Sequence, residues 1–402
     1  MVDFNVQVWN DTRIYMVDFG RARHRHHPHR SCPDVDRYGF MDDANADEHG
    51  PIVSCRMGQP RVNVRFYRTE IDTGARLYAV ASDGHSTIRI LSPGNGRLPN
   101  TRSANISFRP VAAGRTSIDI HYWWPDGPII GRLYVEVRAT RVIRCRFHLL
   151  SLNGSGFGNS FLGEARPAGT AAATHRTNRI RDIVRDTNHV LEPHGIQIVN
   201  SGTVNTAWTN AIFPGAGPAF RQVMQGMATS PNRAANRLNV FLCDWGQAAA
   251  AVPAPPFNLG FVALGPPVAW ATQIGAQWNV GGVNHTGNGI FVDSSASPFT
   301  GSILAHEFGH IFHLSSMSAA GVVSQWHTIG DPNASRDDLL TRRRMMYPYT
   351  TLRNSNNNWR NNVGYGNNMG SLLVQRQNNQ DSTLQESRRA YNNATPGNVY
   401  AP

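Results

Sequence analysis

The chain has 402 residues, of which 40% are hydrophobic, and this is enough for apolar cores in two or more domains. Basic residues outnumber acidic ones by 38 to 27, but no nucleic-acid recognition motif accompanies the formal charge of +11, so we expect no nucleic-acid partner. No apolar run reaches the roughly 20 residues of a membrane span, so we expect no membrane-spanning helix.

The first 50 residues show no periodic pattern. Residues 21–30 form a basic, histidine-rich run that we interpret as a solvated loop. The N-terminus lacks both the charged segment and the apolar segment of a signal peptide. We therefore expect a soluble protein that stays in the cytoplasm, is exported by a non-classical route, or has a leader that this sequence does not include. Cys32 and Cys55 could form a disulfide in an oxidising compartment.

Residues 60–140 alternate between apolar and polar side chains, with the period of two that is typical of strands. The clearest runs are 62–66, 118–122 and 133–137. Turn sequences rich in Gly, Pro and Asp separate such runs, and this favours an antiparallel all-β sandwich with an immunoglobulin-like layout. We predict an accessory domain over residues 1–140 that serves in substrate or surface attachment.

A different pattern begins at Arg141. An apolar run at 142–150 predicts a first strand, and the amphipathic stretch 174–191 predicts a long helix that ends at Pro193. Three further strands are predicted at 196–199, 237–244 and 289–293. A second helix is predicted at 219–227. This alternation predicts an α+β domain over residues 141–402.

The segment 302–314 carries the strongest chemical signal. Its apolar residues recur at helical spacing without an internal proline, so a helix is predicted. On a helix, His306 and His310 lie one turn apart on one face, where both can bind one zinc ion. Glu307 lies beside them and can take a proton from a zinc-bound water. This is the His-Glu-x-x-His pattern of zinc peptidases.

A catalytic zinc ion needs a third protein ligand and an open position. The only later glutamate is Glu386, whose distance along the chain argues against a glutamate ligand. His313 would lie about 10 Å further along a continuous helix than His306, so it could bind only if the helix ended after His310. His327 and the aspartates that follow it, at 331, 337 and 338, are the other candidates.

At this point the chain resembles the metzincin superfamily of zinc endopeptidases. The usual pattern is His-Glu-x-x-His-x-x-Gly-x-x-His followed by a methionine turn. His313 and Ser316 stand where the glycine and the third histidine are expected, and both are departures. A segment inserted after the helix, as in leishmanolysin-like members, would make His327 a delayed third ligand. The resemblance implies a twisted sheet over two helices, with substrate along an edge strand within residues 258–285.

The segment 344–348, Arg-Met-Met-Tyr-Pro, resembles the methionine turn of the matrixin type. This turn forms an apolar floor under the zinc histidines. Met346 is our choice for the floor, because it gives the Met-Tyr-Pro match. If Met345 takes that role instead, Tyr347 falls where astacin-like members place a tyrosine that donates to the oxyanion.

We therefore expect a zinc-dependent endopeptidase that acts on proteins or peptides. Zn2+ is held by His306, His310 and His327, and Glu307 is the general base. The alternative is a catalytically degenerate, peptidase-like protein that binds or adheres through its β-sandwich. The missing glycine and histidine favour this alternative, whereas the intact Glu307 and Met-Tyr-Pro sequence oppose it.

Overall fold

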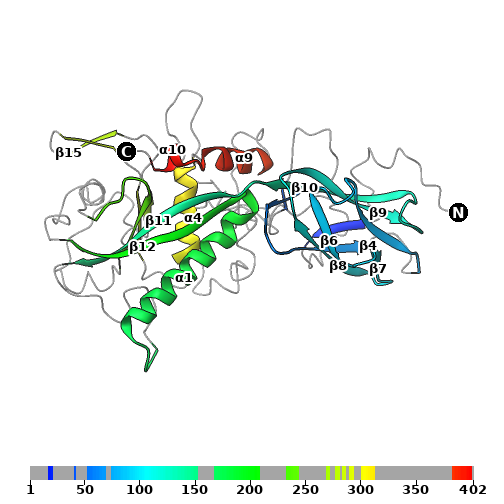
Figure 1. Ribbon diagram of the computed structural model, residues 1–402, viewed down its shortest axis with the longest axis horizontal. Coiled ribbons are helices and arrows are strands. Elements are labelled where there is room, and N and C mark those ends of the chain that lie inside the picture. Colours follow the sequence, from blue (N-terminus) through cyan, green and yellow to red (C-terminus); the bar gives the residue numbers. More distant parts are fainter. Residues whose placement is uncertain are drawn as a thin grey trace, which may run out of the picture.

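Figure 1 shows the computed structural model of the chain. The structure describes residues 17–20, 40–41, 52–68, 74–152, 167–208, 232–243, 269–271, 277–280, 283–286, 289–293, 300–312 and 383–400. Over these ranges the protein is β-rich, has few helices and comprises more than one domain. None of the helices within them combines the length and apolar character that a membrane crossing requires.

The N-terminal part, which we call the two-sheet unit, consists of two sheets. The first has the order β1-β4-β8-β6 and contains β1 (Val17–Gly20), β4 (Val62–Arg68), β6 (Ile88–Ser92) and β8 (Ser103–Pro110). The second has the order β2-β3-β10-β9-β5-β7 and contains β2 (Phe40–Met41), β3 (Ile52–Arg56), β5 (Leu77–Ala81), β7 (Arg97–Leu98), β9 (Gly114–Tyr122) and β10 (Ile129–Arg138). Only β3 and β10 pair in parallel; the other described pairs are antiparallel.

One apolar core lies between these sheets. The alternation predicted for β4 is confirmed, because Val62, Val64 and Phe66 are buried in this core together with residues of the facing sheet. Cys55 of β3 is a free thiol in the same core. Cys32, the partner suggested for Cys55 in a disulfide, lies outside the described residues.

Two acidic residues break the alternation on β9 and β10. Asp119 and Glu136 occupy polar positions of these strands, yet both are buried. Asp119 accepts two hydrogen bonds from Arg132, at 2.7 and 2.8 Å, in the bidentate geometry that suits a guanidinium group. Glu136 is covered by other parts of the chain. Burial of a charged group is tolerated when the group is paired in this way.

The C-terminal part, which we call the mixed-sheet unit, has a five-stranded sheet of the order β12-β11-β13-β17-β14. Its strands are β11 (Arg141–Leu152), β12 (Ile196–Trp208), β13 (Leu238–Cys243), β14 (Ala269–Ala271) and β17 (Gly289–Asp293). All neighbours pair in parallel except β14, which runs antiparallel to β17 at the edge. The short strands β15 (Gln277–Val280) and β16 (Val283–Thr286) form a separate pair.

The helices of the mixed-sheet unit are α1 (Ala172–Leu191), the 3-10 turn η2 (Glu192–His194), α4 (Thr300–Ile311), α9 (Thr383–Asn393) and α10 (Pro396–Val399). The helix predicted at 174–191 is confirmed as α1, and Gly195 ends the following turn with a φ of 75°. The strands predicted at 142–150, 237–244 and 289–293 are confirmed as β11, β13 and β17. The helix predicted at 219–227 lies outside the described residues.

Strand β12 is longer than predicted, because it continues through Asn-Ser-Gly, a sequence typical of turns. The pairing with β11 shifts in register between Cys145 and Phe147, so the extra residues form an irregularity in a continuing strand. The hydroxyl of Ser201 donates to the carbonyl of Cys145 at 2.9 Å and holds this irregularity in place. The strand therefore spans 13 residues and not four.

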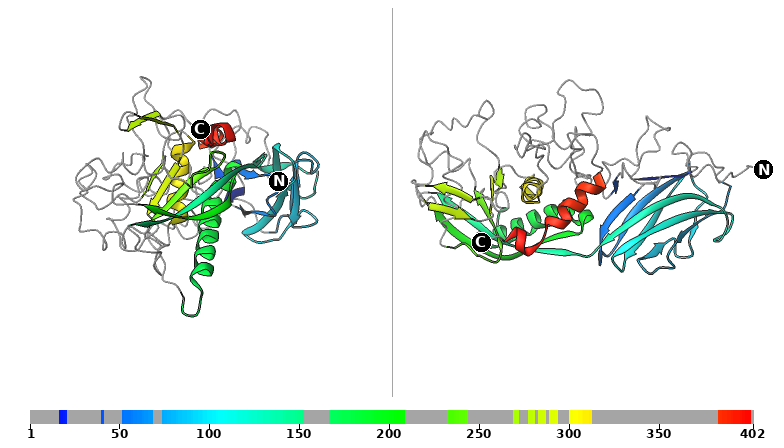
Figure 2. Two further views of the ribbon diagram at one scale, coloured as in Figure 1. Left: turned by 60° about the vertical axis from the view of Figure 1, so that its left-hand side comes forward. Right: turned by 90° about the horizontal axis from the view of Figure 1, so that it is seen from above.

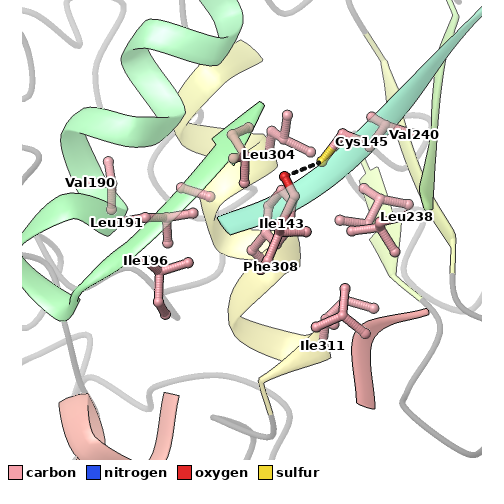
Figure 3. Close-up of a cluster of buried hydrophobic side chains, with 14 of the residues drawn as sticks. Ile143, Cys145, Val190, Leu191, Ile196, Leu238, Val240, Leu304, Phe308 and Ile311 are labelled. Atoms are coloured by element: carbon pink, nitrogen blue, oxygen red, sulfur yellow. Dashed lines mark hydrogen bonds between the residues drawn. The ribbon is translucent and has the colours of Figure 1, made fainter. Parts of the chain in front are cut away.

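One face of the five-stranded sheet is covered by α1 and α4, and Figure 3 shows the apolar side chains packed between them. Ile143 and Cys145 of β11 meet Leu304, Phe308 and Ile311 of α4 in this core. Parallel strands that are covered by helices are rich in apolar residues, which accounts for the apolar runs of β11 and β13. The apolar face of α4 is thus fixed against the sheet.

Helix α4 also approaches α1 closely at Gly301. A Cβ atom at this position would lie 2.6 Å from Cβ of Asp186 and 3.0 Å from the carbonyl oxygen of Ile183. The hydroxyl of Thr187, on α1, lies 2.9 Å from the carbonyl oxygen of Gly301 and can donate to it. The first turn of α4 is therefore positioned by contact with the backbone of α1, and only glycine leaves room for it.

We predict that Gly301→Ala lowers the free energy of unfolding by about 1–3 kcal/mol, the usual cost of forcing a methyl group into a packed interior. Urea unfolding measures the change. Gly397→Ala in α10 is the matched control, because a Cβ atom there would meet nothing within 4 Å. Equal midpoints for the two variants would contradict the close approach of α1 and α4.

Candidate metal centre on helix α4

The predicted zinc helix is observed as α4, with bounds somewhat different from those expected. It begins two residues before Ser302 and ends at Ile311. Phe312 still donates its backbone N–H to the carbonyl of Phe308, at 2.9 Å. The helix therefore includes His310 within its regular hydrogen-bond pattern. His313 lies outside the described residues.

The helical register separates the apolar face of α4 from the predicted ligand positions. Leu304, Phe308 and Ile311 fall within one narrow arc and are fully buried in the core. At about 100° per residue, positions 306 and 310 fall on the opposite side of the helix, one turn apart. The side chains of His306 and His310 lie outside the described part of the structure. The backbone alone gives these two positions a common face that is directed away from the core.

Glu307 lies between these two faces, and its side chain is buried, with 5% of its surface exposed. Burial raises the pKa of Glu307 well above its usual range, because a charged carboxylate loses its hydration there. A cation close to the carboxylate would act in the opposite direction and favour the charged form. Such a residue can be poised to take up and return a proton.

The other predicted site residues lie outside the described part of the chain. These are the third-ligand candidate His327, Met346 of the methionine turn and the possible oxyanion donor Tyr347. In the ranges that the structure describes, no three His, Cys, Asp or Glu side chains form a group that could hold a metal ion. The complete ligand set therefore stays a prediction, while the structure brings positions 306, 307 and 310 together on α4.

Helix α4 packs against β14 and β17 of the mixed sheet. Strand β14 is the edge strand, and its residues 269–271 fall within the range 258–285 expected for the substrate-binding edge. Figure 1 shows α4, in yellow, crossing behind strands of the sheet. A peptide can extend a sheet by pairing with an edge strand. The helix that carries His306 and His310 therefore lies beside an element that could hold an extended chain.

A second polar cluster lies on the other face of the sheet, and the sequence analysis did not identify it. His148 is fully buried and stacks on Phe241, with ring centroids 4.2 Å apart. Its Nδ1 atom lies 3.1 Å from the Thr206 hydroxyl, and its Nε2 atom lies 3.0 Å from the Asn239 side-chain oxygen. The Asn239 amide is oriented by two hydrogen bonds to the backbone of Ala234. Because the Asn239 oxygen only accepts, Nε2 carries the proton of a neutral ring.

Burial lowers the pKa of His148 to about 4, although the hydrogen bond to Asn239 opposes part of this shift. The unfolded chain takes up a proton on this residue near pH 6.5, whereas the folded chain does so only near pH 4. The unfolded state therefore binds more protons between these two values. It follows that this histidine makes the protein less stable as the pH falls from 6.5 to 4.

We predict that this single group removes on the order of 3 kcal/mol of stability between pH 6.5 and pH 4. As the pH falls from 6.5 to 4, the wild type should lose this stability and His148→Gln should not. The difference in unfolding free energy between the two proteins, measured by urea unfolding at each pH, should therefore narrow by this amount. His85→Gln, at an exposed position, controls for the loss of a histidine. A difference that does not depend on pH would show that His148 is not held neutral.

Comparisons with known proteins were made for the whole chain. No protein-family model matches the sequence, and no curated protein matches it. Solved structures that match include domains 4 and 5 of the S-layer protein SbsC, at 17% identity and a TM-score of 0.16, over 24% of this chain and 51% of that one. An endo-fucoidan hydrolase from glycoside hydrolase family 107 matches at 19% identity and a TM-score of 0.15, over 25% of this chain and 15% of that one. The chain thus spans about half the length of the first of these structures and a smaller share of the second.

Proposed function

We propose that the chain is a zinc-dependent endopeptidase, with an immunoglobulin-like β-sandwich before a metzincin-like catalytic domain. The observation that carries this proposal is the construction of α4. Its apolar face is buried against the sheet, its face with positions 306 and 310 is directed away from the core, and the carboxyl group of Glu307 is buried beside them. A helix that served only to fill the core would have no use for a buried glutamate at this position.

The arrangement of the mixed-sheet unit supports the fold part of the proposal. A twisted sheet over two helices is what the resemblance to metzincins implies, and α1 and α4 cover one face of such a sheet. The antiparallel edge strand β14 has the position expected of the strand that holds the substrate. The two facing sheets around one core, with mostly antiparallel pairing, support the sandwich part of the proposal.

The donor set suits zinc. Histidine nitrogens are common ligands of this ion, and two histidines four residues apart on a helix can bind the same one. His306, His310 and His327 would hold the ion and leave one position open. When bound, the ion would supply a Lewis acid that polarises the scissile carbonyl and makes water more acidic. Burial raises the pKa of Glu307, and a bound cation would lower it again and favour the charged carboxylate.

The protein groups have distinct roles in peptide hydrolysis. Glu307 takes a proton from the attacking water and returns it to the leaving amine as the C–N bond breaks. Its burial keeps this proton from exchanging freely with bulk solvent. Met346 forms the floor under the histidines. If Met345 takes that role instead, Tyr347 is the donor for the oxygen of the scissile carbonyl. The backbone of β14 pairs with the extended substrate.

A second candidate function is binding through the two-sheet unit. Among the described residues, Trp123 and Trp124 are large apolar side chains with 42% and 52% of their surface exposed. They follow β9, at the end of the unit that lies far from β11, and Trp123 has a φ of 71° that is rare for a bulky residue. Strained, exposed aromatic residues occur at binding sites. This loop favours an attachment role for the two-sheet unit, whether or not the mixed-sheet unit is catalytic.

We predict that the wild type cleaves members of a diverse peptide pool in the presence of zinc, and that Glu307→Gln cleaves none. The substitution keeps the shape of the side chain but removes the group that accepts the proton. Mass spectrometry of the pool identifies the cuts, and elemental analysis measures bound zinc. Zinc binding should be nearly unchanged in the variant. Full activity of Glu307→Gln would contradict the proposal, whereas zinc binding without cuts in either protein would favour the binding function.

We further predict that His327→Ala weakens zinc binding by about 10-fold or more, because a three-ligand site is reduced to two protein ligands. Competition with a chromogenic chelator measures the dissociation constant. His313→Ala is the matched variant, since it removes the other histidine that follows the helix. If His313→Ala loses the metal and His327→Ala retains it, His313 is the third ligand.

A further inference from the structure

The two units are joined by a buried polar cluster at the end of β10. Arg138 is 5% exposed and forms an ion pair with Glu136, at 2.8 Å between its NH2 group and the carboxylate. Its NH1 group donates to the hydroxyl and the carbonyl oxygen of Ser387, at 2.7 and 2.8 Å. Ser387 is a residue of α9, 249 positions further along the chain. A buried guanidinium of the two-sheet unit thus holds the last long helix.

The carboxylate of Glu136 makes a second connection to α9. Arg388 donates to it at 2.7 Å, so one acidic group pairs with an arginine from each unit. Burial alone would raise the pKa of Glu136, but Arg138 and Arg388 lower it, so that the group stays charged. A charge buried in this way is tolerated only while its partners remain in place. The helix is therefore held at a fixed position relative to β10.

The end of α9 also contacts the first residue of β11, directly after the junction of the two units. The guanidinium of Arg141, in the first residue of β11, lies 4.0 Å from the centre of the Tyr391 ring. It also donates to the carbonyl oxygens of Tyr391 and Asn392, at the end of α9. An arginine that satisfies the last carbonyls of a helix stabilises that end. The middle and the C-terminal end of α9 are therefore tied to β10 and to the start of β11.

The last residue of α9 reaches the zinc helix. The side-chain amide of Asn393 donates to the carbonyl oxygen of Phe312, at 3.0 Å. Phe312 directly follows α4, and the last carbonyls of a helix have no partner within it. The end of α4 is thus capped by a side chain 81 positions away. Figure 2 shows α9, in red, between α4, in yellow, and the strands of the two-sheet unit.

We propose that α9 is a brace through which the two-sheet unit fixes the C-terminal end of the zinc helix. Asn393, Ser387 and Arg388 are positioning residues in this arrangement. The chain leaves α4 at Phe312 toward the segment that contains His313 and His327. The direction in which it leaves decides whether a distant third ligand can return to the metal. The role toward zinc rests on the proposed function; the brace itself does not.

Hydrogen exchange in the metal-free, full-length protein tests the brace directly. In Asn393→Ala, backbone amides in a peptide that covers residues 304–312 should exchange about fivefold faster, the effect of losing one net hydrogen bond. Asn392→Ala is the matched control, because this exposed neighbour contributes only its carbonyl, which alanine retains. Unchanged exchange in Asn393→Ala, or equal acceleration in Asn392→Ala, would overturn the proposal.

A second variant tests the link from the two-sheet unit. Arg388→Gln removes the ion pair with Glu136 and should accelerate exchange in the same peptide, although residue 388 is far from it in sequence. Arg115→Gln is the control, since Arg115 also pairs with Glu136, at 3.6 Å, but belongs to β9. Exchange in β8 should not change in either variant, which separates a local effect from global unfolding. Acceleration by Arg115→Gln alone would contradict a brace through α9.

Zinc affinity, measured by competition with a chelator, separates this inference from the proposed function. Asn393→Ala should weaken zinc binding by about fivefold, and Asn392→Ala should leave it unchanged. If the wild type binds no zinc, the proposed function fails, while the exchange result still decides on the brace. If zinc binds with equal affinity to all variants, α9 does not act on the site.

Discussion

The structure depends on the burial of one face of α4. Leu304, Phe308 and Ile311 are fully buried between the sheet and α1, and each such side chain contributes roughly 2 kcal/mol through removal from water. A helix cannot rotate without exposing these residues, so its register is fixed. The orientation of every other residue on α4 follows from that register. In this protein, the packing of apolar side chains therefore determines which way the chemical groups face.

The parts of the fold that the sequence predicts are those with a strong local period. The alternation at 62–66 and the amphipathic stretch at 174–191 each place their apolar residues on one face, and both elements are observed. The same holds for α4, where both the apolar residues and the two histidines recur at the spacing of an α-helix. The common face of positions 306 and 310 could be predicted because it needs only the geometry of one helix.

The features that the sequence did not predict are produced by contacts between distant residues. A polar residue within an alternating run is expected to be exposed, yet Asp119 and Glu136 are buried because arginines from other positions pair with them. His148 is buried because Thr206 and Asn239 satisfy its ring. No periodic pattern contains this information. The proposed ligand His327 is of the same kind, because a distant residue would reach α4 only through the path of the chain.

Buried charged groups at the junction between the two units fix the position of α9 relative to β10. Arg138 loses its hydration on burial, and Glu136, Ser387 and the carbonyl oxygen of His194 replace the lost water only at specific positions. A displaced α9 would take Ser387 away from this guanidinium and Arg388 away from Glu136, at a cost of several kcal/mol. Small displacements of α9 relative to β10 are therefore opposed. Because Asn393 donates to the carbonyl oxygen of Phe312, the end of α4 shares that resistance to movement.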